Sequence, residues 1–130
     1  MPGIILLVDD QAEFREIFSI KLASAGFHVE VADGGEHAVE IAKRIIPDLI
    51  LMDVEMPGTS GVDALLKIKA DPVTKNVRVI FLTNLGDPQQ DWQKLNSRIS
   101  REIGAAGYIK KTENLDVLVQ KVKDFLALPV

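Results

Sequence analysis

The chain has 130 residues, with 15 basic and 19 acidic side chains, a formal net charge of -4 and no cysteine. A chain of this length is typical of one domain, so we expect residues 1–130 to form a single domain with one core. The charge balance gives no general attraction to nucleic acid or to an anionic membrane, and the absence of cysteine excludes a disulfide framework and a thiolate metal site. The first apolar run is too short to span a bilayer, so we expect a soluble, cytoplasmic protein.

The first half of the chain alternates apolar runs of strand length with segments of helical period. A strand is expected from Ile4 to Val8, followed by a helix from about Gln11 to Ala25, with Gly26 suited to its C′ position. The run from Phe27 to Ala32 alternates apolar and polar residues, which suits an edge strand. The next helix is expected from Asp33, whose side chain can cap it, to before Pro47.

The second half continues the alternation. Strands are expected from Leu49 to Met52 and from Val79 to Leu82, and a helix that opens at Ser60 and stops before Asp71 lies between them. A fourth helix capped by Asp87, a fifth strand from Gly107 to Lys111 and a fifth helix after Thr112 are expected next. Repeated strand and helix segments of this kind indicate a parallel sheet.

The character of the strands predicts their order. The first, third and fourth strands are continuously apolar, as expected of strands buried on both faces. Asp9, Asp10 and Asp53 can share a site only if the first and third strands are neighbours, and right-handed crossovers then place helices on both faces of the sheet. The predicted fold is therefore α/β, a doubly wound five-stranded parallel sheet of order 2-1-3-4-5, in a flavodoxin-like (βα)5 three-layer sandwich.

Reactive side chains stand where four of these strands end. Asp9 and Asp10 follow the first strand, Asp53 the third and Thr83 the fourth, and Lys111 ends the fifth. Ligand sites of open parallel sheets lie just outside the carboxyl ends of the strands, so these groups are expected to converge. Three adjacent carboxylates repel one another unless a cation neutralises them, and an all-oxygen site with room for water suits Mg²⁺.

Such a site suggests phosphoryl chemistry, because a carboxylate such as Asp53 can accept a phosphoryl group when a metal screens the incoming charge. Structural explanations remain open for single residues. Asp9 and Asp10 could be a turn-and-cap pair, Asp53 a buried structural residue, and Thr83 a group that satisfies a strand end.

At these positions the chain resembles the receiver domain of two-component response regulators. The family pattern is an acidic pair after the first strand, an Asp followed by a Met-Pro-Gly turn after the third, Ser or Thr after the fourth and Lys after the fifth. Here the pattern reads Asp9-Asp10, Asp53 with Met56-Pro57-Gly58, Thr83 and Lys111. The family places its lysine three residues after an aromatic residue, and Tyr108 therefore favours Lys111, with the adjacent Lys110 as the alternative.

The resemblance implies a role for each residue. Asp9, Asp10, Asp53 and the main-chain carbonyl of Glu55 would hold Mg²⁺, and Asp53 would take a phosphoryl group from a sensor histidine kinase or a histidine phosphotransfer protein. Lys111 would pair with the carboxylates at rest and with the phosphoryl group after transfer.

The resemblance also implies a switch. Thr83 and Tyr108 would change the face formed by helix 4, strand 5 and helix 5, which would bind a downstream protein or a second copy of the chain. On this interpretation the chain is a phosphoacceptor and not an enzyme, with no nucleic acid or membrane as partner.

Four features depart from the family pattern, one of which is Thr112 after Lys111, where Pro is commonest. Asn84 follows Thr83 where a small residue is usual, and Glu55 places a carboxylate two residues after Asp53, so we expect an altered rate of dephosphorylation. The segment between Thr83 and Lys111 is longer than the family norm by about six residues, nearly two turns at 3.6 residues per turn.

Two rival functions follow from other features of the sequence. A phosphatase of the haloacid dehalogenase type would need a second Asp where Glu55 stands. A degenerate receiver that binds proteins without phosphorylation is the main alternative.

Overall fold

The computed structural model describes residues 3–53, 61–83, 105–111 and 114–127. The elements are, in chain order, β1 (Ile4–Val8), α1 (Ala12–Ser24), β2 (His28–Ala32), α2 (Gly35–Ile45), β3 (Leu49–Asp53), α3 (Gly61–Ala70), β4 (Arg78–Thr83), β5 (Ala105–Lys110) and α6 (Leu115–Ala127). The predicted fourth helix, capped by Asp87, lies outside the described residues.

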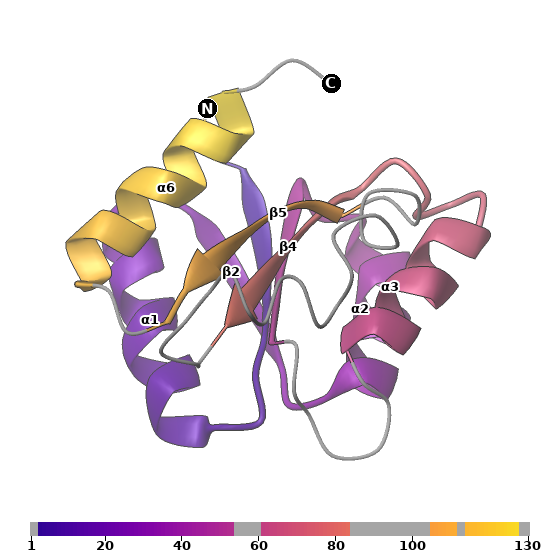
Figure 1. Cartoon of the computed structure of the whole chain (residues 1–130), viewed down its shortest axis with the longest axis horizontal. Helices are drawn as coiled ribbons and strands as arrows, with labels where there is room; N and C mark the ends of the chain where they lie inside the picture. The colour runs from indigo at the N-terminus through magenta and orange to yellow at the C-terminus, as the bar shows by residue number, and fades with distance from the viewer. Residues whose placement is uncertain (1–2, 54–60, 84–104, 112–113, 128–130) are drawn as a thin grey trace.

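The five strands form one sheet of order β2-β1-β3-β4-β5, in which every neighbouring pair is parallel. Figure 1 shows α1 and α6 together on one side of this sheet and α2 and α3 on the other. The predicted α/β fold and strand order are confirmed, with the alternating strand β2 at an edge and the apolar strands β1, β3 and β4 inside.

Two hydrophobic layers, one on each face of the sheet, hold the helices in place. The layer under α2 and α3 contains Leu6, Val8, Ile50, Met52, Val79 and Phe81 from the strands and Ala38, Ala42, Ala64, Leu65 and Ile68 from the helices. The layer under α1 and α6 contains Ile5, Leu7, Leu49, Leu51, Ile80, Leu82 and Ile109 with Phe18, Leu22, Leu118, Val119 and Val122. Successive strand residues face opposite sides, so a strand buried on both faces must be apolar throughout.

Local sequence signals predicted the C-terminal end of α1 correctly but not the N-terminal cap of α2. Gly26 has φ 102 after the end of α1, which is the left-handed conformation that a C′ glycine supplies. The prediction that Asp33 caps α2 is wrong: Gly34 occupies the N-cap position without a side-chain cap. The Asp33 carboxylate instead lies 2.5 Å from Nδ1 of His37, one turn further along the chain.

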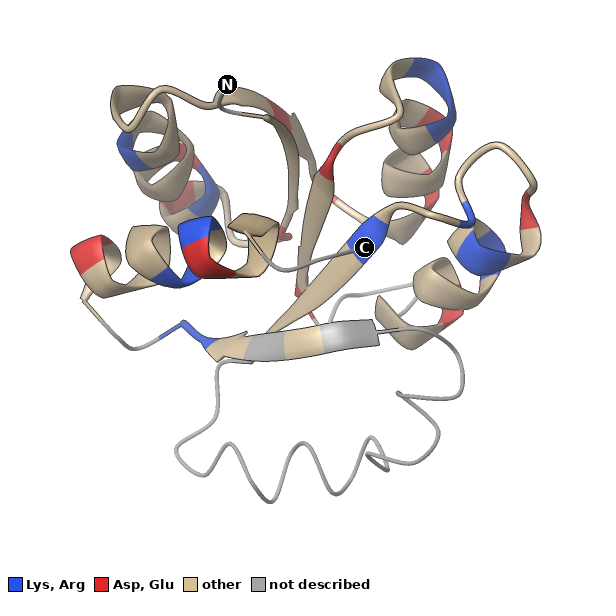
Figure 2. Cartoon of the chain, turned by 90° about the horizontal axis from the view of Figure 1, so that it is seen from above, with Lys and Arg blue, Asp and Glu red and all other residues tan. Residues whose placement is uncertain are grey.

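Charged residues of both signs are interspersed along the four described helices (Figure 2). Within the described ranges, none of the helices is long and apolar enough to cross a membrane.

Candidate functional site

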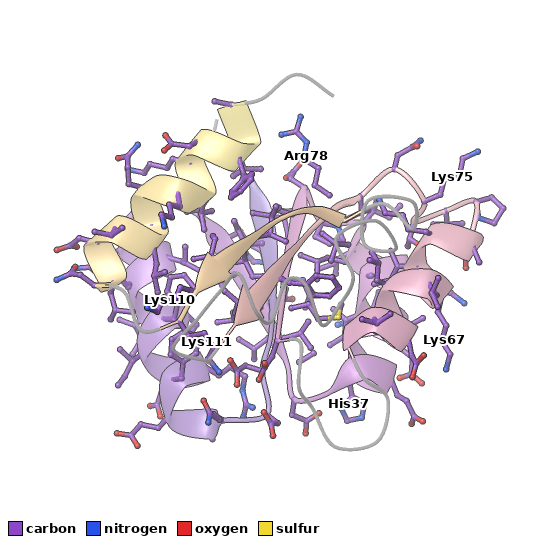
Figure 3. All side chains as sticks on the ribbon, in the orientation of Figure 1. His37, Lys67, Lys75, Arg78, Lys110 and Lys111 are labelled. Atoms are coloured by element: carbon purple, nitrogen blue, oxygen red, sulfur yellow. The ribbon has the colours of Figure 1, made fainter. Side chains whose placement is uncertain are left out.

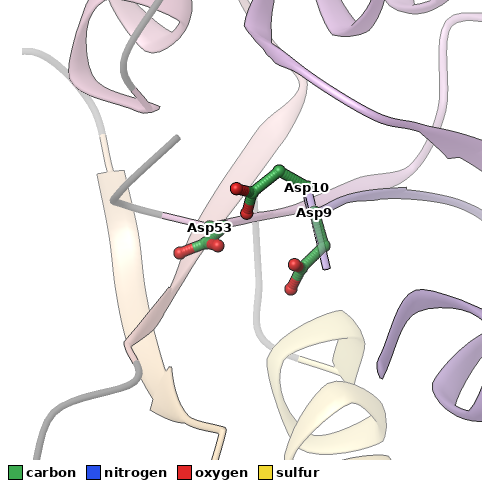
Figure 4. A group of neighbouring side chains, drawn as sticks. All are labelled: Asp9, Asp10 and Asp53. Carbon is green, nitrogen blue, oxygen red and sulfur yellow. The ribbon is translucent and has the colours of Figure 1, made fainter. Parts of the chain in front are cut away.

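Three aspartates meet at the carboxyl ends of two neighbouring strands. Asp9 and Asp10 follow β1 directly, and Asp53 is the last residue of β3. Because Val8 pairs with Met52 in the sheet, the two strands end at the same level. One carboxylate oxygen from each aspartate lies within 4.8 Å of the other two (Figure 4). Asp9 and Asp53 are buried and Asp10 is exposed, so the cluster extends from the interior to the surface of the protein.

The β1–α1 connection fixes the Asp9 carboxylate. Its Oδ1 accepts a hydrogen bond of 2.8 Å from the backbone N–H of Gln11, and its main-chain oxygen accepts one of 2.6 Å from Arg15. The turn suggested as a structural role for this residue therefore exists, but it occupies only one carboxylate oxygen. The other oxygen, Oδ2, faces the inside of the site.

Lys111 brings a buried positive charge to the cluster. Its side chain is 3% exposed, and its Nζ lies 2.7 Å from Asp9 Oδ2 and 3.5 Å from Asp53 Oδ2. The neighbouring Lys110, labelled beside Lys111 in Figure 3, is half-buried. In the sheet it pairs with Thr83. Of the two lysines considered from the sequence, the structure places Lys111 against the carboxylates.

Two further residues at this ammonium were not identified from the sequence. Gln11 Oε1 accepts a hydrogen bond of 2.8 Å from Lys111 Nζ, and the Phe14 ring centroid lies 4.6 Å from the same nitrogen. Both stand at the start of α1, shortly after the acidic pair. In the sequence, only their closeness to the acidic pair could have indicated that they belong to the site, because neither residue type indicates phosphoryl or metal chemistry.

The donor set of the cluster fits a hard divalent cation. In the described part of the site, three carboxylates face the Lys111 ammonium, so negative charge is in excess there. Asp9 Oδ2 is buried and has no hydrogen-bond partner within the described parts of the chain, and its close contact there is the ion pair with Lys111 Nζ at 2.7 Å. Clustered carboxylate oxygens of this kind are the ligands that Mg²⁺ prefers. Asp9, Asp10 and Asp53 could therefore hold such an ion.

For Thr83 and Tyr108, the structure describes the backbone position in the sheet. Thr83 is the last residue of β4, which neighbours β3, and Tyr108 in β5 pairs with Phe81 of β4. The predicted roles of the Thr83 hydroxyl and the Tyr108 ring lie beyond what the structure describes, as do Glu55, Asn84 and the Met56-Pro57-Gly58 turn.

Comparisons with known proteins place the chain among signalling domains. The family model for the response regulator receiver domain matches residues 5–123. The phosphate regulon transcriptional regulatory protein PhoB of Pseudomonas aeruginosa is 36% identical over 124 residues, which cover 94% of this chain and 51% of that protein. Sporulation initiation phosphotransferase F of Bacillus subtilis is 31% identical over 124 residues, which cover 95% of this chain and 94% of that protein.

A solved structure shares the fold over nearly the whole length. The chemotaxis protein CheY4 of Vibrio cholerae superposes with a TM-score of 0.83 at 26% identity, covering 96% of this chain and 99% of that one. The chain therefore spans about half the length of PhoB but nearly all of CheY4 and of the sporulation phosphotransferase.

Proposed function

Because this chain belongs to the response regulator receiver domain family, we propose that Asp53 accepts a phosphoryl group from a histidine kinase or a histidine phosphotransfer protein. Members of this family receive their signals from such proteins. The observation that supports the proposal most strongly is the meeting of Asp53 with two further carboxylates and the Lys111 ammonium at one edge of the sheet.

In the proposed transfer, Asp53 is the nucleophile. One of its carboxylate oxygens forms a bond to the phosphorus of the donor, while the bond from phosphorus to the donor's imidazole nitrogen breaks. The electron pair of the broken bond stays on that nitrogen, which takes up a proton. The product is an acyl phosphate on a residue that is 4% exposed.

Lys111 supplies positive charge where the phosphoryl oxygens arrive. Its ammonium lies 3.5 Å from Asp53 Oδ2 before any transfer, so it needs little movement to reach an oxygen on the phosphoryl group. A charge that is fixed beforehand in a buried site stabilises developing negative charge more than a solvated one does.

Asp9, Asp10 and Asp53 would hold the Mg²⁺ ion, together with the main-chain carbonyl of Glu55, which lies outside the described residues. When bound, the ion screens the negative charge of the incoming phosphoryl group. Asp9 keeps its Oδ2 turned into the site because Oδ1 is tied to the backbone of Gln11.

Receiver domains are signalling domains, and we infer that this one works as a single phosphoacceptor domain over residues 1–130, not as an enzyme, in the cytoplasm. Phosphorylation would shift a two-state equilibrium through Thr83 and Tyr108, whose strands are neighbours. The output would be binding of a downstream protein or of a second copy at the face of helix 4, β5 and α6, without nucleic acid or membrane.

The experiment that tests this function is incubation with Mg²⁺ and a small acyl-phosphate donor, followed by intact mass measurement. We expect the wild type to gain one phosphoryl group and Asp53→Asn to gain none. No gain in either protein would favour a degenerate receiver that binds its partners without phosphorylation.

A further inference from the structure

Among the residues that the structure describes, the Lys111 ammonium has two neutral partners besides the two carboxylates. Gln11 Oε1 accepts a hydrogen bond from it at 2.8 Å, and the Phe14 ring centroid lies 4.6 Å away. Both come from the start of α1, and Phe14 is itself held by Phe18, whose ring centroid is 5.4 Å from its own. The ammonium is thus surrounded by α1 as well as by the strand ends.

Gln11 contacts both members of the buried ion pair. Its backbone N–H donates to Asp9 Oδ1 at 2.8 Å, while its side-chain oxygen accepts from Lys111. One residue therefore sets the orientation of the carboxylate and of the ammonium that lies 2.7 Å from that carboxylate.

The lysine cannot hold this position through its own side chain. Lysine has a flexible four-carbon stem and three equivalent N–H donors, so its partners decide where the ammonium sits. Asp9 is a charged acceptor 2.7 Å away, whereas Asp53 is 3.5 Å away. Without another acceptor, we expect Asp9 to draw the ammonium further from Asp53.

We propose that Gln11 is a positioning residue that keeps Lys111 within reach of the phosphoryl group on Asp53. The inference rests on the proposed phosphoacceptor function. The neutral amide oxygen is suited to this task because it holds one N–H of the ammonium without adding negative charge that would compete with the phosphoryl oxygens. Phe14 contributes the face of its ring, over which the ammonium lies.

The test compares phosphorylation rates with a small acyl-phosphate donor and Mg²⁺. Gln11→Met keeps the length of the side chain and removes the acceptor, and we expect phosphorylation to slow about tenfold, because hydrogen bonds from charged donors are among the stronger ones. The matched control is Gln120→Met on α6, where the lost bond is an exposed one to Asp124. This control should phosphorylate at the wild-type rate.

A double-mutant cycle separates positioning from a general structural effect. If Gln11 acts through Lys111, Gln11→Met should slow phosphorylation in the wild type but change it less than about twofold in a Lys111→Met background. Losses that multiply in the double variant would overturn the inference, as would a wild-type rate in Gln11→Met alone.

A second measurement does not depend on phosphorylation. In protein labelled with ¹⁵N, the Lys111 ammonium signal should shift in Gln11→Met and stay in place in Gln120→Met. An unchanged signal would overturn the inference even if the rate fell. If the wild type itself gains no phosphoryl group, the proposed function fails and the inference with it. If the wild type is phosphorylated and Gln11→Met matches it, only the inference fails.

Discussion

The Lys111 ammonium lies 2.7 Å from Oδ2 of Asp9, and both side chains are almost completely buried. This pair joins the end of β5 to the end of β1, which are not neighbours in the sheet. Removal of one partner of a buried ion pair leaves an uncompensated charge, which is strongly destabilising.

We therefore expect Lys111→Met to lower the free energy of unfolding by about 3 kcal/mol in the absence of Mg²⁺. Urea denaturation measures this change. Lys110→Met is the matched control, because Lys110 is half-buried and one residue away in the sequence. A loss of equal size in both variants would show that the ion pair is not the cause.

Mg²⁺ should raise the melting temperature of the wild type, because a ligand that binds only the folded state adds RT ln(1 + [L]/Kd), about 2.7 kcal/mol at a concentration of one hundred times Kd. Asp10→Asn should abolish most of this rise, since it removes one of the three carboxylates of the cluster. The same variant should be more stable than the wild type without Mg²⁺, because it relieves repulsion between like charges.

Asp124→Asn is the control for this measurement, because Asp124 is an exposed carboxylate on α6. It should keep the full response to Mg²⁺. A melting temperature of the wild type that does not move at millimolar Mg²⁺ would argue against the metal site.

The pair of Asp33 and His37 should make stability depend on pH. The hydrogen bond and the charge of Asp33 raise the pKa of His37 above its ordinary 6.5, and the same hydrogen bond lowers the pKa of Asp33 below 3.8. The stabilisation from His37 is complete below pH 6.5 and is lost as pH rises through the raised pKa of His37. The stabilisation from Asp33 is lost as pH falls through the lowered pKa of Asp33.

NMR titration of His37 checks this expectation. In Asp33→Asn, the pKa of His37 should fall, because the substitution removes the negative charge and leaves a weaker acceptor. A His37 titration curve that is identical in the two proteins would mean that the pair does not form in solution.

Thr74 should contribute to stability through one buried hydrogen bond. It is 1% exposed, and its hydroxyl donates to the carbonyl of Ile68 at 2.7 Å, which holds the segment after α3 against the core. Thr74→Val keeps the shape and removes the bond, so we expect a loss of about 1 kcal/mol in the free energy of unfolding. Denaturation at neutral pH measures it, and an unchanged midpoint would contradict the assigned bond.

Most of the fold could be predicted because its signals are local. The three inner strands β1, β3 and β4 are apolar runs that lead directly into a polar residue. Because Asp9 follows Val8 and Asp53 follows Met52, the sequence itself shows which end of each strand carries the carboxylate. Asp9, Asp10 and Asp53 can share a site only if β1 and β3 are neighbours, and right-handed crossovers then place helices on both faces of the sheet.

The contacts of Gln11 and Phe14 could not be predicted in the same way. Gln11 and Lys111 are 100 residues apart in the sequence. The sequence gives no signal that an uncharged side chain such as Gln11 contacts an ammonium group. The predicted Asp33 cap was wrong for a related reason. Its carboxylate has a competing partner in His37, and the helix can begin one residue later at a glycine.

The central claim is that Asp53 itself carries the phosphoryl group. The residue that is phosphorylated can be identified directly. The wild type is incubated with Mg²⁺ and a small acyl-phosphate donor, reduced with borohydride to convert the acyl phosphate to homoserine, digested, and sequenced by mass spectrometry. The account predicts homoserine at position 53 and nowhere else. Homoserine at position 9 or 10, or at no position, would contradict it.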